Sequence, residues 1–369
     1  MTALREHSIE KRIQELKALK LRRESGKFNL IPFYEHLPRF SEQVPGFIPG
    51  VMYKILSQSG IGKTKLVKFL TIIMPFYYFK VFGEKFHTIY FALEESENEF
   101  IDSLIVMLLK IKYNIRTDTL ALSSYYKHAL SDELLVKIEA CSKDVQDILN
   151  HVTIIDNVYN PTGCYKACRE ISKLKGTHIY RNVEINGKTE KIYSHYKAND
   201  PEERILVVAD HVGLMTPESG KSLHQTMSMW SMDYCKKQIS KHWGWIVVNV
   251  QQLMAAGEDV EHFKNNKLEP SLDKAADNKI VIRDDYVVLG LFAPVRYEIT
   301  KHLGYDVTKL LDNYRCLSVL KNRLGRPGLK IGLYFDGATN EFSELPLPDS
   351  LSMPKVYQDI LDNNKKKKS

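Results

Sequence analysis

The sequence predicts an α/β fold in which a mostly parallel sheet carries helices on both faces. Short apolar runs recur with the length of buried strands, and segments with helical periodicity separate the early runs. Parallel strands that are buried on both faces appear as continuous apolar runs, and each needs a crossover to reach the next. The composition agrees, since 44% hydrophobic and 26% charged residues are ordinary for a globular domain.

The first element is a charged helical segment near the start of the chain. Ile9, Ile13 and Leu16 fall along one stripe of a helix spanning residues 3–24. We therefore expect residues 1–26 to form a separate helix that docks on its own domain or on an adjacent subunit.

The main domain is expected over residues 27–350. Its entry, residues 27–50, holds four prolines and two glycines. Strands are predicted at 51–56, 88–93, 152–155, 205–208, 245–250, 286–292, 315–320 and 330–335, and helices at 63–74, 97–112, 131–149 and 223–241. The closing runs lie beside Gly-Arg-Pro-Gly and Asp-Gly turn signals, which favour an antiparallel meander.

One segment departs from this alternation of strands and helices. Residues 177–203 contain two strand patterns, 179–185 and 189–195, on either side of an Asn-Gly pair. Asn-Gly is the strongest short signal for a hairpin turn. We therefore expect a β-hairpin insertion on the surface.

Charge and composition restrict the functional class. The formal net charge is +7, which permits nucleic acid as a partner without establishing it. Residues 351–369 end in a run of lysines and are expected to be a basic, solvated tail. The longest apolar stretch, residues 70–79, is too short to span a bilayer and is interrupted by Pro75. The five cysteines lack a paired spacing, which indicates reduced thiols rather than a metal site, and we expect a cytoplasmic protein without a membrane partner.

A phosphate-binding motif occupies residues 57–64, Ser-Gln-Ser-Gly-Ile-Gly-Lys-Thr, between a predicted strand and a predicted helix. It matches the P-loop pattern except at Ser57, where a glycine is usual. Glycines let successive backbone N–H groups face the phosphates, and the helix N-terminus adds its dipole. Lys63 would neutralise the β- and γ-phosphates, and the hydroxyl of Thr64 would ligate Mg²⁺. The residues expected to bind ATP are Ser59, Gly60, Ile61, Gly62, Lys63 and Thr64.

Acidic residues end two of the predicted strands. Asp210 closes one apolar run, where a carboxylate could hold Mg²⁺, although a helix N-cap is an alternative. Glu94 and Glu95 close another, and a glutamate there could act as the general base that activates water. We assign that role to Glu94, the first acid after the strand, and expect Glu95 to be a charge at a helix N-terminus.

The order of these motifs resembles the motor domain of DnaB-type replicative DNA helicases. Pro49-Gly50 is similar to that family's entry into the P-loop strand. The further similarities are Ala-Leu-Glu-Glu at 92–95 to its SLEM element, residues 208–215 to its Walker B stretch, residues 248–253 to its ALSQL element, and residues 320–327 to its KxRxGP motif. The resemblance covers about residues 28–345. The sequence departs from the family at Ser57, at His211 and at Arg326, which is inserted in the last motif.

The resemblance implies a RecA-like P-loop NTPase fold that uses ATP and Mg²⁺. It implies that Glu94 is the catalytic base, that Gln252 is a polar sensor (with Gln251 as a neighbouring alternative), and that Lys321 and Arg323 reach the nucleotide of an adjacent subunit. The implied partners are single-stranded DNA, further copies of the chain in a ring, most simply a hexamer, and a primase or helicase loader. The N-terminal helix resembles the family's linker helix. The architecture without the primase-recruiting domain resembles that of phage proteins, which act in the host cytoplasm.

Two loops are candidates for DNA contacts, residues 216–222 and residues 255–279. The second contains Lys264, Lys267 and Lys274, but acidic residues bring its net charge close to neutral. Two other functions stay open, a RecA/RadA-type recombinase and a non-hydrolysing assembly factor that uses ATP to hold a ring. The KxRxGP-like motif favours the helicase over the first, and the intact catalytic groups argue against the second.

Overall fold

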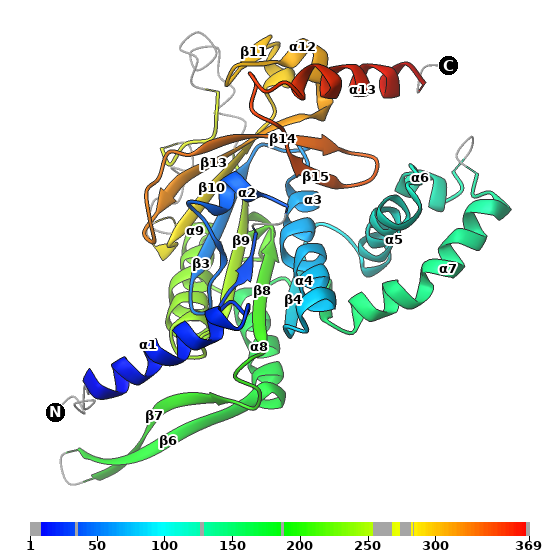
Figure 1. Cartoon of the computed structure of the whole chain (residues 1–369). Coiled ribbons are helices and arrows are strands. Elements are labelled where there is room, and N and C mark those ends of the chain that lie inside the picture. Colours follow the sequence, from blue (N-terminus) through cyan, green and yellow to red (C-terminus); the bar gives the residue numbers. More distant parts are fainter. Residues whose placement is uncertain are drawn as a thin grey trace.

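A computed structural model describes residues 9–33, 36–125, 129–185, 188–253, 268–273, 282 and 284–366. Within them a nine-stranded sheet has the order β15-β14-β13-β10-β3-β9-β8-β4-β5 (Figure 1). The six parallel strands are β3 (Met52–Ser57), β4 (Phe86–Ala92), β5 (Val152–Ile155), β8 (Arg204–Asp210), β9 (Ile246–Gln252) and β10 (Val287–Phe292). The antiparallel edge consists of β13 (Tyr314–Asn322), β14 (Lys330–Asp336) and β15 (Glu341–Glu344). The predicted parallel sheet and closing meander are confirmed.

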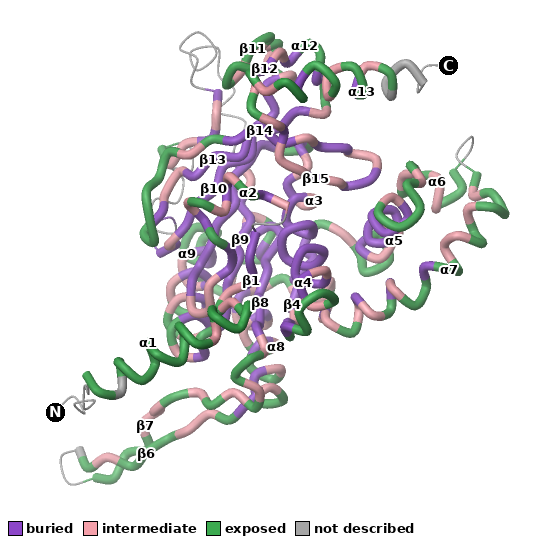
Figure 2. Tube along the Cα trace, viewed as in Figure 1, coloured by how far each residue is buried: buried purple, intermediate pink, exposed green. Residues whose placement is uncertain are grey.

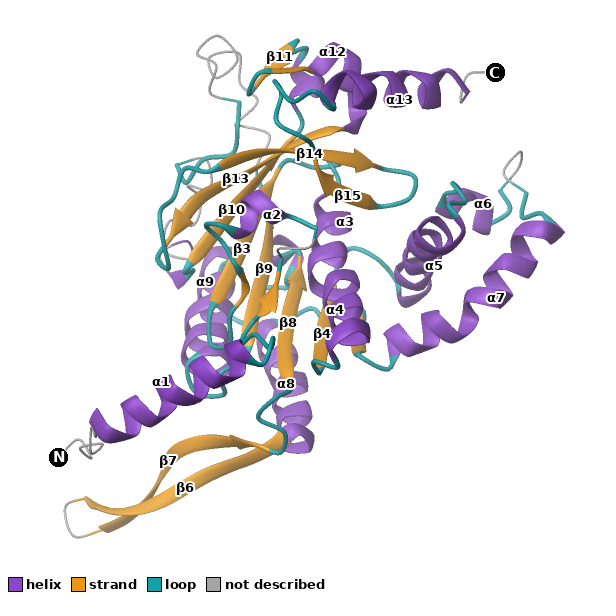
Figure 3. Cartoon of the chain, viewed as in Figure 1, coloured by secondary structure: helices purple, strands orange, loops and turns teal. Residues whose placement is uncertain are grey.

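Helices cover both faces of the sheet (Figure 3). One face carries α3 (Lys63–Lys68), the π-helical turn η1 (Phe69–Ile73), α4 (Met74–Phe82), α5 (Glu97–Tyr113) and α7 (Asp132–Leu149), and the other carries α8 (Pro161–Lys175), α9 (Leu223–Ser228) and the π-helix η3 (Met229–Ser240). Side chains alternate along each strand, so that Val208 packs in the first layer and Val207 in the second. The sheet is therefore buried on both faces, as its purple strands in Figure 2 show.

The helix after the P-loop runs further than the sequence predicted. It continues through Pro75 to Phe82, because a π-helical turn precedes the proline. A proline in a helix removes one N–H donor and crowds the carbonyl four residues earlier. That carbonyl belongs to Thr71, and it accepts a hydrogen bond of 2.8 Å from the hydroxyl of Thr88 on β4. Widening of the turn and this external donor explain why Pro75 does not end the helix.

The predicted hairpin insertion is present. Strands β6 (Gly176–Ile185) and β7 (Lys188–Ala198) pair antiparallel and project away from the body of the molecule (Figure 1). The Asn-Gly turn on which the prediction rested lies outside the described residues.

The chain-terminal segments are both helical. Helix α1 (Ile9–Glu24) exposes Ile9 and Leu16, and Arg22 at its end pairs with the buried Glu84 at 2.7 Å. Within residues 351–369, expected as a tail, α13 (Met353–Lys366) buries Met353 and Ile360 against α12 (Val307–Leu310). The lysine run drew the prediction toward a tail, while the apolar stripe ahead of it makes a packed helix.

Smaller elements complete the fold. They are β1 (Ile31–Pro32), α2 (Pro38–Ser41), β2 (Gly46–Phe47), α6 (Thr119–Leu122), η2 (Val212–Leu214), η6 (Pro294–Tyr297), β11 (Lys301–His302), β12 (Tyr305–Asp306) and η7 (Leu311–Asn313). Across the described ranges, every helix is too short or too polar to cross a lipid bilayer.

Candidate nucleotide-binding site

The P-loop connects β3 to α3 at the edge of the sheet where the parallel strands end. Gly60 and Gly62 adopt positive φ angles of 68° and 95°, which residues with a Cβ atom rarely adopt. A Cβ on Gly62 would also lie 2.7 Å from the ring of Phe335. The loop therefore requires glycine at both positions, and its backbone is shaped to surround an anion.

Two arginines from distant parts of the chain hold this loop. Arg296, on η6, donates from both terminal nitrogens to the carbonyls of Ser59 and Gly60, each at 2.7 Å. Arg315, buried on β13, donates from Nε to the carbonyl of Ile61 at 2.7 Å and lies over the ring of Phe335. Neither was predicted, because a contact across 237 residues leaves no local signal in the sequence.

Three of the predicted site residues meet at the amino group of Lys63. Its Nζ donates to Oε1 of Gln252 at 3.4 Å and lies 3.8 Å from Oε2 of Glu94. Lys63 is only 5% exposed, so the ammonium faces these two groups rather than bulk water. The structure thus joins the ends of β3, β4 and β9 at one cation, and it favours Gln252 over Gln251 as the residue that faces the P-loop.

Asp210 supplies a carboxylate to the same edge of the sheet. It is buried, and Oδ2 accepts a hydrogen bond of 2.8 Å from the hydroxyl of Tyr90. Burial raises the pKa of Asp210, while Lys63, Tyr90 and Thr64 act in the opposite direction. Oδ1 is buried without a hydrogen-bond partner among the described residues. An orphaned carboxylate oxygen near a threonine hydroxyl is a donor set that suits Mg²⁺, so Thr64 and Asp210 fit the predicted metal site.

Glu94 and Glu95 have different surroundings. The side chain of Glu94 is 47% exposed and faces Lys63, whereas that of Glu95 is 18% exposed and pairs with the buried Lys68 at 2.8 Å. The expectation that Glu95 is a helix N-terminal charge is therefore wrong. Helix α5 is capped instead by Ser96 and Glu99, which form a reciprocal capping box.

Lys321 and Arg323 lie at the opposite edge of the sheet from the P-loop. Asn322, between them, pairs with Val287 at the start of β10, while the P-loop adjoins the end of that strand. Lys321 donates to the carbonyl of Ile282 at 2.7 Å, and the exposed Arg323 lies over the ring of Tyr286. Within one chain these two cations do not join Lys63.

The two loops that were candidates for DNA contacts fare differently. In the first, Glu218 accepts hydrogen bonds from the backbone N–H of Thr162 and the side chain of Asn160, which tie the loop to α8. Lys264, Lys267 and Lys274 of the second lie outside the described residues.

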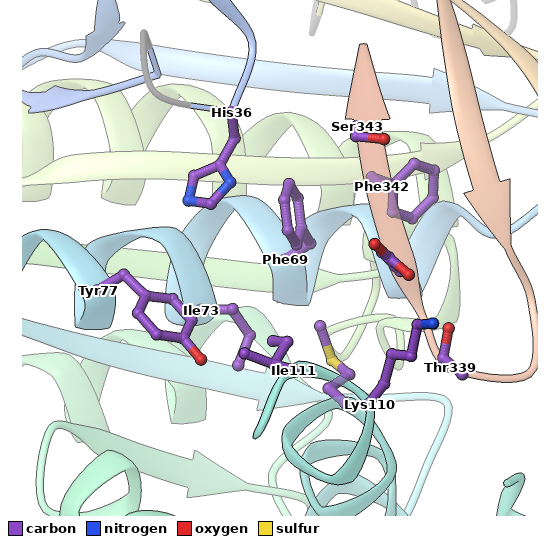
Figure 4. Close-up of a pocket in the computed structure, with 11 residues that line it drawn as sticks. His36, Phe69, Ile73, Tyr77, Lys110, Ile111, Thr339, Phe342 and Ser343 are labelled. Carbon is purple, nitrogen blue, oxygen red and sulfur yellow. The ribbon is translucent and has the colours of Figure 1, made fainter. Parts of the chain in front are cut away.

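A separate pocket of about 260 Å³ lies between η1, α4, α5 and β15 (Figure 4). Phe69, Ile73 and Phe342 contribute apolar walls, and His36 and Lys110 contribute polar groups. It shares no residue with the P-loop cluster, so it is not the phosphate site.

Comparisons with known proteins establish the fold. No protein-family model and no curated protein matches the sequence. The structure is similar to a solved ATPase domain of a DnaB-like helicase, with a TM-score of 0.65 and 16% identity over 93% of this chain and all of the other. It is also similar to a DnaB-like replicative helicase studied with its primase interactions, with a TM-score of 0.63 and 16% identity over 94% of this chain and 69% of the other. The chain therefore has a RecA-like P-loop NTPase fold.

Proposed function

We propose that this protein is an ATP-hydrolysing DNA helicase motor of the DnaB type that moves along single-stranded DNA as a ring, most simply a hexamer. The observation behind the proposal is the meeting of Lys63, Glu94 and Gln252 beside Asp210 at the ends of four adjacent parallel strands. This is where α/β sheets bind ligands. The likeness of the whole chain to two helicase structures directs the proposal toward DNA.

Each residue has a defined task in this proposal. The P-loop amides and Lys63 bind the phosphates of ATP, and Glu94 accepts a proton from the attacking water. Thr64 and Asp210 would hold Mg²⁺, which supplies neutralising charge to the phosphates. Gln252 donates or accepts at the end of β9, so it links Lys63 to the loop that follows that strand.

The position of Lys321 and Arg323 supports a shared active site. A cation on the far edge of the sheet cannot serve the P-loop of its own chain, but it can serve that of an adjacent subunit. We accordingly propose that α1 links adjacent subunits, that a primase or loader acts with the ring, and that the protein works in the cytoplasm.

The decisive experiment measures ATP hydrolysis and strand separation on a forked duplex, with and without single-stranded DNA. We expect DNA-stimulated hydrolysis and unwinding of a fork with a 5′ tail. Lys63→Ala should abolish both, because the phosphates lose their main cationic partner. Strand exchange without fork unwinding would favour the recombinase instead. Nucleotide binding without turnover would favour the assembly factor.

A further inference from the structure

Three metal-ligating side chains from distant segments meet outside the nucleotide site. They are Glu269, in the described stretch 268–273, His302 on β11 and Cys316 on β13. Oε1 of Glu269 and Nε2 of His302 are 3.2 Å apart, and both atoms lie within 4.8 Å of Sγ of Cys316. A thiol, an imidazole and a carboxylate together form a mixed donor set rather than an acidic cluster.

The donors are held in place by neighbouring groups. Nδ1 of His302 is hydrogen-bonded to the hydroxyl of Tyr314 at 2.8 Å, which turns Nε2 toward Glu269. The other oxygen of Glu269 pairs with Lys330 at 2.8 Å. Histidines that bind metals commonly use their second nitrogen in this way, because the hydrogen bond fixes the tautomer and the ring orientation.

Burial is graded across the cluster. Cys316 is fully buried beside Phe292 and Leu268, the His302 side chain is 10% exposed, and the Glu269 side chain is 30% exposed. An ion could therefore enter past Glu269, and a water molecule on that side could complete its coordination.

We propose that Glu269, His302 and Cys316 bind one Zn²⁺-class ion in a tetrahedral site whose fourth ligand is water. Sulfur and imidazole donors favour zinc over magnesium. With metal–ligand bonds of about 2.1 Å, a tetrahedral ion separates its N and O ligands by roughly 3.3 Å. The Glu269–His302 separation is already close to this value. The thiol needs a closure of no more than about 1 Å to reach the ion.

The ion would hold a connection to the P-loop. The carbonyl of Leu268, next to Glu269, accepts a hydrogen bond of 3.1 Å from the side chain of Gln58 in the P-loop. Fixing Glu269 to β11 and β13 thus fixes the backbone to which Gln58 binds, inside the segment expected to contact DNA. This consequence for DNA rests on the proposed function, whereas metal binding itself does not.

The test is cobalt substitution of the full chain without ATP or DNA. Co²⁺ should produce a thiolate-to-metal charge-transfer band and intense visible bands that report tetrahedral geometry, and Zn²⁺ should displace it at one equivalent per chain. Cys316→Ser should remove the charge-transfer band and weaken Zn²⁺ binding at least about 100-fold, since even outer partners of a site are worth 10- to 100-fold. Cys235→Ser, another fully buried cysteine, is the matched control and should keep the band.

A second variant guards against misfolding of Cys316→Ser. Glu269→Gln changes a partly exposed side chain and should raise the Kd for Zn²⁺ at least about tenfold while the thiolate band remains at saturating Co²⁺. Absence of a thiolate band in the wild type, or its loss in Cys235→Ser, would overturn the site. Single-stranded DNA affinity with and without Zn²⁺ is measured separately, so a protein that does not bind DNA contradicts the helicase and leaves the cobalt result to decide the metal site.

Discussion

Glu94 and Glu95 are adjacent in the sequence, yet the structure gives them unrelated partners. Glu94 lies in solvent beside the P-loop lysine, while Glu95 neutralises Lys68, whose side chain is 1% exposed. Burial raises the pKa of Glu95 and lowers that of Lys68, so each depends on the other to stay charged. One acid is therefore placed for chemistry and the other for the stability of α3.

Exchanging each acid for its amide should separate these roles. Glu94→Gln should retain nucleotide binding and lower the hydrolysis rate roughly 10²- to 10⁴-fold, because only the proton acceptor is lost. Glu95→Gln should keep the chemistry but destabilise the fold by about 1–3 kcal/mol, since Lys68 loses a charged partner. Turnover assays and urea denaturation on both variants check this. The opposite pattern would reverse the assignment of the base.

Arg296 offers a second test at the residue scale. It donates to two P-loop carbonyls through a forked guanidinium, a geometry that lysine cannot reproduce. Arg296→Lys should therefore loosen the loop and raise the KM for ATP about tenfold, which corresponds to about 1.4 kcal/mol, with a smaller change in kcat. Arg326→Lys, at another exposed arginine, is the control. Equal KM values for Arg296→Lys and wild type would mean that the two hydrogen bonds do not shape the loop.

At the scale of elements, the helix through Pro75 depends on a donor from a neighbouring strand. Thr88→Val keeps the shape of the side chain but removes the hydroxyl that binds the carbonyl of Thr71. We expect a loss of about 1–2 kcal/mol in the free energy of unfolding, because the buried carbonyl loses this partner. In a Pro75→Ala background the loss should shrink, since the alanine introduced there supplies the missing N–H. A urea double-mutant cycle measures the difference, and an unchanged loss would disconnect the proline from Thr88.

Elements were predictable where the signal is local. The P-loop, its strand and its helix are contiguous, so Lys63, Thr64, Asp210, Glu94 and Gln252 could be proposed from the sequence, and the structure brings them to one edge of the sheet. The strand β15 was missed because its four residues, Glu-Phe-Ser-Glu, bury one side chain only. The helix α13 was missed although Met353, Val356, Tyr357 and Ile360 follow helical spacing, since the lysine run dominated the prediction for that segment.

Contacts between distant segments were beyond the sequence. The hydroxyl of Tyr90 on Asp210, the two arginines on the P-loop and the Glu269–His302–Cys316 cluster each join segments that are far apart in the chain. No spacing rule marks such a set, and the cysteine count alone argued against a metal. These contacts exist because the strand order places β10 and β13 next to β3, which was not predicted in detail.

The whole molecule has one cation at each of two opposite edges, and this arrangement predicts a shared active site. If Arg323 serves an adjacent subunit, Arg323→Ala should leave nucleotide binding intact and lower hydrolysis roughly 10³-fold. Lys63→Ala should be inactive by itself. In a mixture, an interface between an intact Lys63 and an intact Arg323 rebuilds a complete site, so the mixture should recover activity that neither variant has alone.

Recovery by mixing depends on exchange of subunits, which a pulldown with a tagged variant must establish first. The double variant Lys63→Ala/Arg323→Ala is the matched control, because mixing it with either single variant offers fewer complete interfaces or none. An arginine that acts within its own chain would give no recovery in any mixture, since every chain then lacks one of its own two cations. A pair of proven, exchanging variants without recovery would therefore contradict the ring. Recovery confined to the mixture of the two single variants would mean that each site is built from two chains.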